Sequence, residues 1–504
     1  MQRRKFLQYL TGGVALSAVT AVAGYKLMGE QTIAAGNEPT ALPIPALLEG
    51  EMKDGVRHYD LNMQSGTHEF FKGYKTPTFG INASYLGSTL KLRDGEKVRL
   101  NVTNNIGEVT TLHWHGLHLP AKADGGPHQT VAPGTTWSPE FTVKQKASTF
   151  WYHSHTHEKT GEQVWRGLAG MLIVEDEESK GLALPNTYGV DDIPVILQER
   201  AFNRDGSFIY ASSMHDIMVG MKGNIPVTNG AITPFFQATT KKVRLRILNG
   251  SNSSFYNLGF SDNRPFHQIG SDGGLLESPI EMTRIYLGSA ERAEIIVDVS
   301  DGKEIFLISD GKAPKGSGGR GMMGGMRGMM MGGDGSKFTF MQIRSNGDLK
   351  PSANLPSSLV KIDRLDPRNA VKTRRFELNM RMGPGMMMGG GSAFSINGRA
   401  MDMGYINEVI KLGDTEIWEI SNPSPLPHPF HVHDVQFQIL DRNGAPPHAG
   451  ERGLKDTVVV NSGETVRIIA KFEDYADPDM PYMYHCHILE HEDAGMMGQF
   501  TVVA

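Results

Sequence analysis

A strand pattern recurs three times along the chain, and this repetition constrains the fold more than any other feature of the sequence. In each copy, apolar and polar residues alternate up to an asparagine; the copies span residues 92–104, 240–249 and 412–422. Such alternation is typical of a strand with one buried face. A second element follows each copy, at residues 133–143, 288–299 and 463–472. The repetition predicts three similar β units.

The length and the turn residues extend this prediction. A chain of 504 residues corresponds to about three domains. Short alternating strands between Gly, Pro and Asn turns, without long helical periodicity, predict an all-β chain in which each unit is a Greek-key β-sandwich. We expect the units at residues 45–178, 185–345 and 372–504, joined by a linker at 346–371.

The chain has one cysteine, Cys486, followed by His491 and Met496 at spacings of five and ten residues. A thiolate with imidazole and a weak axial thioether defines a blue-copper electron-transfer site. If the segment is a strand, the flanking His485 and His487 point to the face opposite the cysteine. A second metal site is therefore expected behind the first.

Histidines gather in four clusters, which hold ten of the chain's 18 histidines. Each contains an H-x-H pair, whose imidazoles lie on one strand face roughly 6.5 to 7 Å apart, which suits two copper ligands. For one pair alone, chance or hydrogen bonding in a core explains the spacing equally well. Four pairs beside a Cys-His-Met loop favour metal. The clusters are His113 and His115; His153 and His155; His428, His431 and His433; and His485, His487 and His491.

These four motifs, in this order, resemble the multicopper oxidase family of laccases, bilirubin oxidases and bacterial copper-efflux oxidases, and the copper-efflux branch most of all. The resemblance covers nearly the whole chain and implies three cupredoxin-like domains with four copper ions. It implies a type 1 copper on His428, Cys486, His491 and Met496. It implies a type 2 copper on His113 and His431, and a type 3 pair on His115, His153, His155, His433, His485 and His487.

The middle unit has no histidines at the matching place, residues 253–257. We therefore expect the trinuclear cluster to lie between the first and third units and the middle unit to be a structural bridge. Electrons would pass from Cys486 through the backbone to His485 and His487. Glu492 and Asp124 match the acidic proton-relay positions of the copper-efflux branch; the alternative for both is a solvated surface carboxylate.

The N-terminus resembles a twin-arginine signal peptide. Arg3 and Arg4 precede a weakly apolar run at residues 10–25 that is too short and too polar for a membrane span. We expect a signal at residues 1–35, contact with the twin-arginine export machinery and a periplasmic monomer; an uncleaved basic anchor is the alternative. The formal net charge of −5 gives no case for nucleic-acid binding.

Two segments combine methionine with glycine, at residues 311–335 and 380–389. Their many glycines oppose a regular helix or strand, and thioethers are soft ligands for Cu(I). We interpret both segments as copper-handling, against the alternatives of a flexible linker or an oxidation sink. The candidate ligands for a substrate copper are Met326, Met329, Met386, Met387 and Met388.

One departure from the copper-efflux branch concerns the substrate. An acidic residue and a methionine commonly precede the first type 1 histidine there, whereas Ser424 and Leu426 precede His428 here and cannot be those ligands. We expect oxidation of Cu(I), and of phenols, coupled to reduction of O2 to water, with a role in copper tolerance. The alternatives are a laccase-like phenol, Mn(II) or Fe(II) oxidase and a non-enzymatic periplasmic copper store or scaffold.

Overall fold

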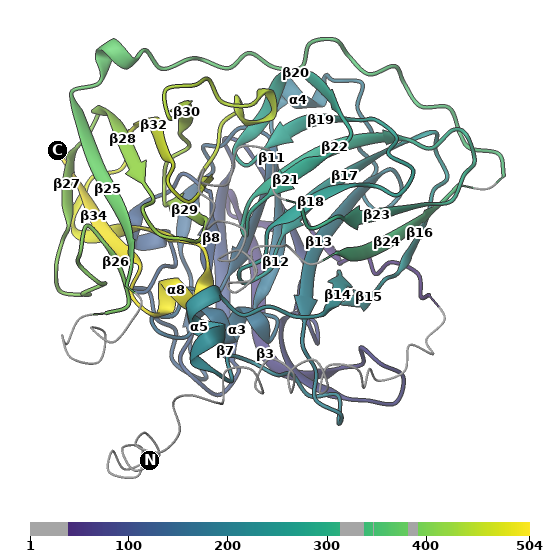
Figure 1. Cartoon of the computed structure of the whole chain (residues 1–504), viewed down its shortest axis with the longest axis horizontal. Coiled ribbons are helices and arrows are strands. Elements are labelled where there is room, and N and C mark those ends of the chain that lie inside the picture. The colour runs from purple at the N-terminus through teal and green to yellow at the C-terminus, as the bar shows by residue number, and fades with distance from the viewer. Residues whose placement is uncertain (1–38, 313–336, 346, 382–391) are drawn as a thin grey trace, which may run out of the picture. The chain divides into compact units, whose positions relative to one another are not determined.

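The computed structural model describes residues 39–312, 337–345, 347–381 and 392–504, whose strands form six sheets (Figure 1). The sheets occur in three pairs, each enclosing its own apolar core. We call these pairs the first, middle and third sandwich. The all-β prediction with three β-sandwiches is therefore confirmed.

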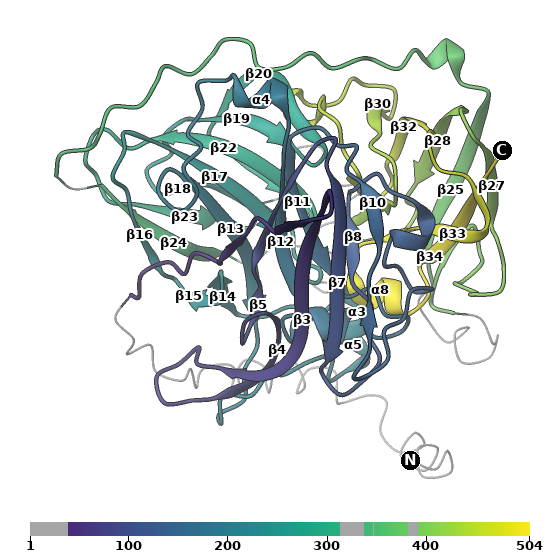
Figure 2. The same cartoon turned by 180° about the vertical axis from the view of Figure 1, so that it is seen from behind.

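The first sandwich combines a sheet in the order β1-β6-β12-β11-β8 with one in the order β10-β7-β3-β4-β5, to which β2 and β9 add. β3 pairs in parallel with β7, and Figure 2 shows the two side by side. Its strands are β1 (Leu47–Leu48), β2 (Glu51–Lys53), β3 (Val56–His68), β4 (Thr76–Ile81), β5 (Leu86–Gly87), β6 (Thr89–Arg93), β7 (Lys97–Asn105), β8 (His113–His115), β9 (Thr136–Trp137), β10 (Glu140–Thr142), β11 (Ser148–His153) and β12 (Ala169–Glu175).

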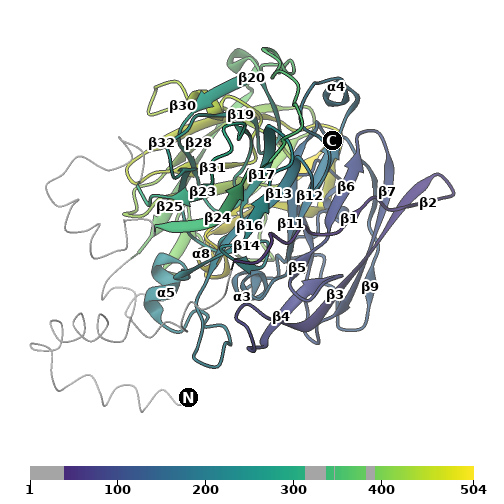
Figure 3. The same cartoon turned by 90° about the vertical axis from the view of Figure 1, so that its right-hand side faces the viewer.

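The middle sandwich combines the orders β15-β14-β13-β17-β22-β19-β20 and β16-β24-β23-β18-β21. Figure 3 shows β12 of the first sandwich beside β13 and β17 of the middle one. Its strands are β13 (Asp192–Arg200), β14 (Ile225–Thr228), β15 (Ala231–Ile232), β16 (Phe235–Gln237), β17 (Lys242–Asn249), β18 (Tyr256–Phe260), β19 (Phe266–Ser271), β20 (Gly274–Met282), β21 (Ile285–Leu287), β22 (Arg292–Asp298), β23 (Ile305–Ser309) and β24 (Phe338–Arg344).

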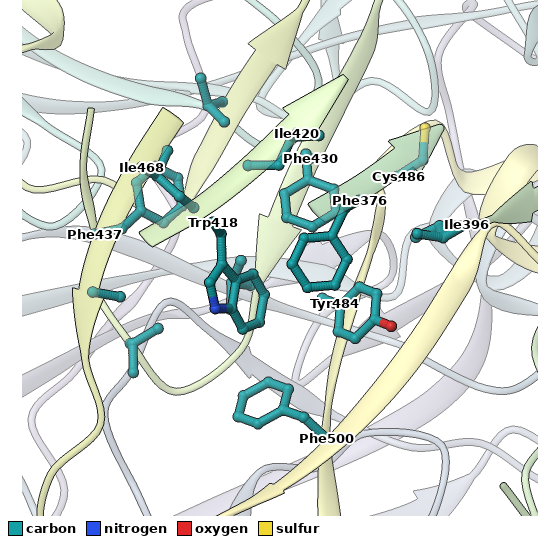
Figure 4. Packing of buried hydrophobic residues seen from close by; sticks show 14 of the residues in the cluster. Phe376, Ile396, Trp418, Ile420, Phe430, Phe437, Ile468, Tyr484, Cys486 and Phe500 are labelled. Atoms are coloured by element: carbon teal, nitrogen blue, oxygen red, sulfur yellow. The ribbon is translucent and has the colours of Figure 1, made fainter. Parts of the chain in front are cut away.

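The third sandwich combines the orders β26-β25-β28-β32-β30 and β27-β34-β33-β29-β31. Its core is aromatic: the ring centroids of Phe376 and Trp418 lie 4.5 Å apart and those of Phe376 and Tyr484 lie 4.8 Å apart. Figure 4 shows Cys486 at the edge of this group. Its strands are β25 (Lys372–Met380), β26 (Phe394–Ile396), β27 (Glu408–Lys411), β28 (Thr415–Ser421), β29 (His428–Val432), β30 (Gln438–Arg442), β31 (Thr457–Val460), β32 (Thr465–Lys471), β33 (Asp477–Cys486) and β34 (Met497–Val503).

The sequence repeat corresponds to one strand pair in each sandwich. The two repeated elements pair antiparallel as β7 with β10, β17 with β22 and β28 with β32. The repeated asparagines, Asn104, Asn249 and Asn422, are buried. Each side-chain oxygen accepts the backbone N–H two residues later, and each amide donates to one carbonyl of its own loop and one of a later segment, Val131, Leu287 and Val460 respectively. The repeat therefore preserves a turn as well as a strand.

The segment predicted as a linker lies against the middle sandwich. Leu359 is buried, and its backbone N–H donates to the Glu277 carbonyl at 2.9 Å. A small apolar cluster includes Leu359 together with Ile269 and Leu275 of the middle sandwich. This segment therefore contributes packing in addition to connecting two units. The proposed unit boundaries themselves stay a prediction.

Three short helices from different sandwiches lie together in Figures 1 and 2: α3 (Thr160–Trp165), α5 (Met214–Val219) and α8 (Leu489–Asp493). The other helical turns in the described ranges are α4 (Glu177–Lys180), η2 (Ala121–Ala123), η3 (Pro367–Asn369) and η4 (Ala449–Glu451). Within the part of the chain that the structure describes, no helix has the length and apolar character needed to cross a membrane. The proposed signal at residues 1–35 lies outside the described residues.

Candidate metal centres

Strand pairing brings the histidine motifs together. In the first sandwich β8 pairs antiparallel with β11, so that His113 lies opposite His153. In the third sandwich β29 pairs antiparallel with β33, so that His431 lies opposite His485. The two ladders meet between the sandwiches, where the rings of His113 and His433 stack with centroids 3.9 Å apart. All eight H-x-H imidazoles are buried: His113, His115, His153, His155, His431, His433, His485 and His487.

Backbone carbonyls lie within hydrogen-bond distance of Nδ1 in four of these histidines, one of them being His485, whose Nδ1 lies 3.1 Å from the Cys486 carbonyl. The Nδ1 atom of His113 lies 2.9 Å from the Asp124 carbonyl, that of His431 lies 2.8 Å from the Asp456 carbonyl, and that of His153 lies 2.8 Å from the Ser154 carbonyl. The N–H must be on Nδ1 to donate to these oxygens, which leaves a lone pair on Nε2. The Nε2 atoms of His113 and His431 have no hydrogen-bond partner among the described residues. Histidine ligands of metals are held in this way.

Two carboxylates hold a second group of three histidines. Glu492 places one oxygen 3.2 Å from His155 Nδ1 and the other 3.0 Å from His485 Nδ1. Asp124 Oδ2 lies 2.8 Å from His433 Nδ1. The Nε2 atoms then face one another, with His485 at 3.1 Å from His155 and at 3.2 Å from His433. Three nitrogens that converge in this way can hold a metal ion. Both acids are buried, so the alternative of a solvated surface carboxylate is wrong.

A third group consists of His115, His153 and His487. His115 Nε2 lies 3.1 Å from Asp456 Oδ1, while its Nδ1 lies 3.4 Å from His153 Nε2. The His487 ring is centred 5.0 Å from that of His115 and 5.3 Å from that of His153. Neither ring nitrogen of His487 has a hydrogen-bond partner in the described ranges. These rings can surround a second ion.

The cysteine lies in a separate buried group on the other side of β33. Cys486 Sγ lies 3.2 Å from His428 Nδ1 and 3.8 Å from His491 Nδ1. The outer nitrogens of these imidazoles bond the protein: His428 Nε2 lies 2.7 Å from Ser424 Oγ, and His491 Nε2 lies 3.2 Å from the Met218 carbonyl. Consecutive residues of one strand therefore serve two different centres.

The loop after Cys486 closes on itself. The Cys486 N–H donates to the Met496 carbonyl at 3.0 Å, and the Met496 N–H donates to the His491 carbonyl at 2.8 Å. The Met496 side chain is buried in the same apolar cluster as Cys486. The ring of Phe394 stacks on that of His491 at 4.2 Å, which limits rotation of the imidazole.

Burial keeps the imidazoles in the form that binds metal. It lowers the pKa of His155 and of His428 to about 3 and the pKa of His431 to about 4. These rings are therefore neutral at ordinary pH and can offer a lone pair. Burial raises the pKa of the Cys486 thiol, so that a thiolate here requires a bound cation. The residues fit copper, which binds thiolate and imidazole well.

Comparisons with known proteins show the family of the chain. Family profiles described as "Multicopper oxidase" match residues 62–179 and residues 368–504. The "Multicopper oxidase mco" of Staphylococcus haemolyticus is 35% identical over 455 residues, which are 89% of each protein. The chain belongs to the multicopper oxidase family. It is accordingly an oxidase that uses copper and dioxygen, as the sequence predicted.

Other similar proteins carry different names. The "Cell division protein FtsP" of a Rahnella species is 35% identical over 504 residues, covering 100% of this multicopper oxidase and 99% of that protein. The solved structure of a laccase-like multicopper oxidase CueO from Ochrobactrum has a TM-score of 0.82 and 36% identity, covering 92% of this chain and 100% of that one. A Campylobacter jejuni multicopper oxidase described as a metallo-oxidase has a TM-score of 0.79 and 27% identity, covering 93% and 96%.

Two residues of the multicopper oxidase that sequence reasoning missed support the histidine cluster. Arg292, in β22 of the middle sandwich, bonds the buried Asp456 through two nitrogens, at 2.7 and 2.5 Å. Burial favours the protonated carboxyl, but Arg292 outweighs it and holds the pKa of Asp456 well below its usual range. Asp456 in turn contacts His115. No motif surrounds either residue, so no pattern in the sequence indicates this pair.

The middle sandwich contacts both centres. The Met218 carbonyl of α5 lies 3.2 Å from Nε2 of His491 at the cysteine centre. Ser289 Oγ donates to the His487 carbonyl at the histidine cluster, at 2.6 Å. The role of the middle unit as a structural bridge without copper ligands stays a prediction, and these two contacts show where such a bridge touches both centres. The five methionines proposed for a substrate copper, Met326, Met329, Met386, Met387 and Met388, lie outside the described residues.

Proposed function

We propose that this multicopper oxidase holds four copper ions and couples one-electron oxidation of Cu(I), and of phenols, to four-electron reduction of O2 to water. The observation that carries the proposal is the placement of His485 and Cys486, adjacent in β33, in two separate buried donor groups. A one-electron inlet and an oxygen-reducing cluster would then be joined by one stretch of backbone.

The proposed type 1 ligands are His428, Cys486, His491 and Met496. His113 and His431 would hold the type 2 copper, and the type 3 pair would be held by His155, His433 and His485 on one side and His115, His153 and His487 on the other. Copper bound there would supply one-electron transfer at the cysteine and reduction of dioxygen at the histidine cluster. The protein fixes the imidazoles through their second nitrogens and keeps them neutral.

Glu492 and Asp124 are proposed to deliver the protons that the reduction of dioxygen consumes. Each oxygen of Glu492 contacts the Nδ1 atom of a cluster histidine, and Asp124 contacts His433 in the same way. Burial favours a protonated Glu492, but the imidazoles of His155 and His485 outweigh it and lower the pKa of this carboxyl. A buried carboxylate beside the histidine cluster can take up a proton and release it towards the cluster.

The substrate assignment is supported by a polar pocket beside the type 1 ligands. The pocket has a volume of about 700 Å³, and Glu377, Asn379 and Met380 line it together with Ser424. Ser424 bonds His428 directly. Glu377 and Met380 bring a carboxylate and a thioether to this pocket, which favours a metal ion such as Cu(I), although Arg381 also lines it and Ser424 replaces the expected acid. Related structures described as laccase-like and as a metallo-oxidase make phenols, Fe(II) and Mn(II) the other substrates to test.

Export to the periplasm through the twin-arginine machinery, and a role in copper tolerance, complete the proposal. Arg3 and Arg4 ahead of the weakly apolar run at 10–25 support export. Copper tolerance follows if Cu(I) is the reductant, since its oxidation removes the ion that binds thiols most tightly.

A non-enzymatic role is the second candidate, because relatives named for cell division match the full length of the chain. It is disfavoured here because all twelve proposed ligands are in place. The deciding experiment compares oxygen consumption by the copper-loaded protein with Cu(I), Fe(II), Mn(II) and a phenol. Replacing Cys486 with Ser should abolish both blue absorption and turnover with every substrate while the fold survives. Turnover that persists in this variant would contradict the proposed inlet.

A further inference from the structure

Helix α8 lies at the place where all three sandwiches meet, and its consecutive side chains have different partners. His491 belongs to the cysteine centre and Glu492 to the histidine cluster. Glu490 and Asp493 on either side contact the other two sandwiches. The orientation of this one short helix therefore places one residue at each of the two centres, His491 and Glu492.

Asn252, in the middle sandwich, joins the three parts. Its side-chain amide donates to Glu490 Oε1 at 2.8 Å and to the Gly161 carbonyl of α3 at 3.0 Å. Its backbone carbonyl accepts the Leu489 N–H at 3.0 Å. Asn252 is fully buried, so these groups have no access to water as an alternative partner.

The two acids of α8 are anchored on further groups. Glu490 also accepts the Met221 N–H at 2.9 Å and the Tyr210 hydroxyl at 3.1 Å. Asp493 accepts the N–H groups of Thr160 and Gly161, both at 2.8 Å. Gly161 leaves the space for this convergence, because a Cβ atom there would lie 2.2 Å from the Tyr210 hydroxyl. The middle sandwich thus holds the N-terminal end of α8, and the first sandwich holds the C-terminal end.

We infer that Asn252 is a positioning residue for both copper centres: by fixing Glu490, it sets the orientation of His491 at the type 1 copper and of Glu492 between His155 and His485. The inference rests on the proposed function, since it assumes copper at these residues. It assigns a role to the loop of the middle sandwich that matches the ligand-bearing loops of the other two sandwiches. That loop has no histidine, yet it acts on the ligands of its neighbours.

The test is the spectrum and the reduction potential of the type 1 copper in Asn252→Leu. Leucine is similar in size and neutral, but it cannot donate to Glu490 or to the Gly161 carbonyl. The matched control is Asn257→Leu, which removes a comparable amide bond from Asn257 to Asp310 at 2.8 Å in the same sandwich. Copper content and thermal midpoint are measured first, so that the spectra compare folded, fully loaded proteins.

We expect Asn252→Leu to shift the type 1 potential and the copper hyperfine splitting in electron paramagnetic resonance, with Asn257→Leu matching the wild type. Tyr210→Phe, which removes one bond to Glu490 without changing volume, should give a smaller shift. Wild-type values in both Asn252→Leu and Tyr210→Phe would overturn the inference. If Asn252→Leu does not fold, Tyr210→Phe decides alone: an unchanged potential and hyperfine splitting overturn the inference. A wild-type protein without blue absorption would instead refute the proposed copper site itself.

Discussion

The middle sandwich and the two outer sandwiches share one turn but use it differently. In the first and third, the loop after the repeated asparagine leads to β8 and β29, which carry H-x-H or H-x-x-H motifs. In the middle one the equivalent loop leads to β18, which has none. The asparagine side chain makes the same bonds in all three. The asparagine turn therefore forms without copper ligands beside it. The middle sandwich, which has no such ligands, instead contacts the outer two sandwiches.

The largest loss of activity should come from replacing a proposed copper ligand that belongs to one of the two outer sandwiches. Replacing His485 with Ala removes one of the three Nε2 atoms that face one another. It also removes the ring that Glu492 contacts in the wild type. We expect oxygen reduction to be lost while blue absorption at Cys486 remains, which optical spectroscopy and oxygen uptake can check. The matched change in the middle sandwich, Ser289→Ala, removes only a bond to the His487 carbonyl. Equal losses of oxygen uptake in the two variants would contradict the distinction between a copper ligand and a residue that only supports one.

A smaller loss is expected when the proton path is cut. Glu492→Gln keeps the shape of the side chain but cannot take up and release a proton beside the histidine cluster. Loss of a general acid or base typically lowers kcat by about 10² to 10⁴, and the type 1 copper should still be reduced at the wild-type rate. Stopped-flow reduction under anaerobic conditions, followed by mixing with oxygen, separates the two steps. Slow reduction of the type 1 copper would argue against this role.

For the middle sandwich, the decisive variant is Arg292→Met. It leaves Asp456 buried without its cation, and breaking a buried ion pair costs about 3 to 5 kcal/mol. Denaturant unfolding should show this loss, together with weaker copper retention at the histidine cluster. Arg264→Met is the control, because Arg264 pairs with the partly exposed Asp262 and Asp301 and should matter by about 1 kcal/mol or less. Similar losses in the two variants would contradict the support role.

The smallest effect concerns a direct contact between the outer sandwiches. Burial alone would lower the pKa of His118, but Asp434 and Asp474 outweigh it and raise this pKa to about 9. The folded pKa is above the ordinary value of 6.5, so the stabilisation is complete at pH below that value and is lost as pH rises through about 9. The free energy of unfolding of wild type minus that of His118→Gln should fall by about 3 kcal/mol between pH 6, where Asp434 and Asp474 are ionised, and pH above 9. A difference that does not change with pH would show that His118 does not titrate in this range.

Much of the site follows from local periodicity. A strand reverses its face at each residue, so the sequence alone predicts that His485 and Cys486 serve different centres. The repeat likewise predicts which strands recur. Asp456, Arg292 and Asn252 could not be predicted, because their roles depend on contacts between residues more than 100 positions apart. The acids were predicted only by resemblance, and their burial between imidazoles came from the structure.

The five residues of α8 also determine which changes the chain can accept. Each residue of an α-helix turns the next by about 100°, so one inserted or deleted residue between Cys486 and Met496 would direct the Glu492 carboxylate elsewhere and detach His491 from the sulfur. A substitution at one position of α8 leaves the directions of its other side chains unchanged. Among related sequences, this stretch should therefore keep a constant length, even where nearby surface loops gain or lose residues.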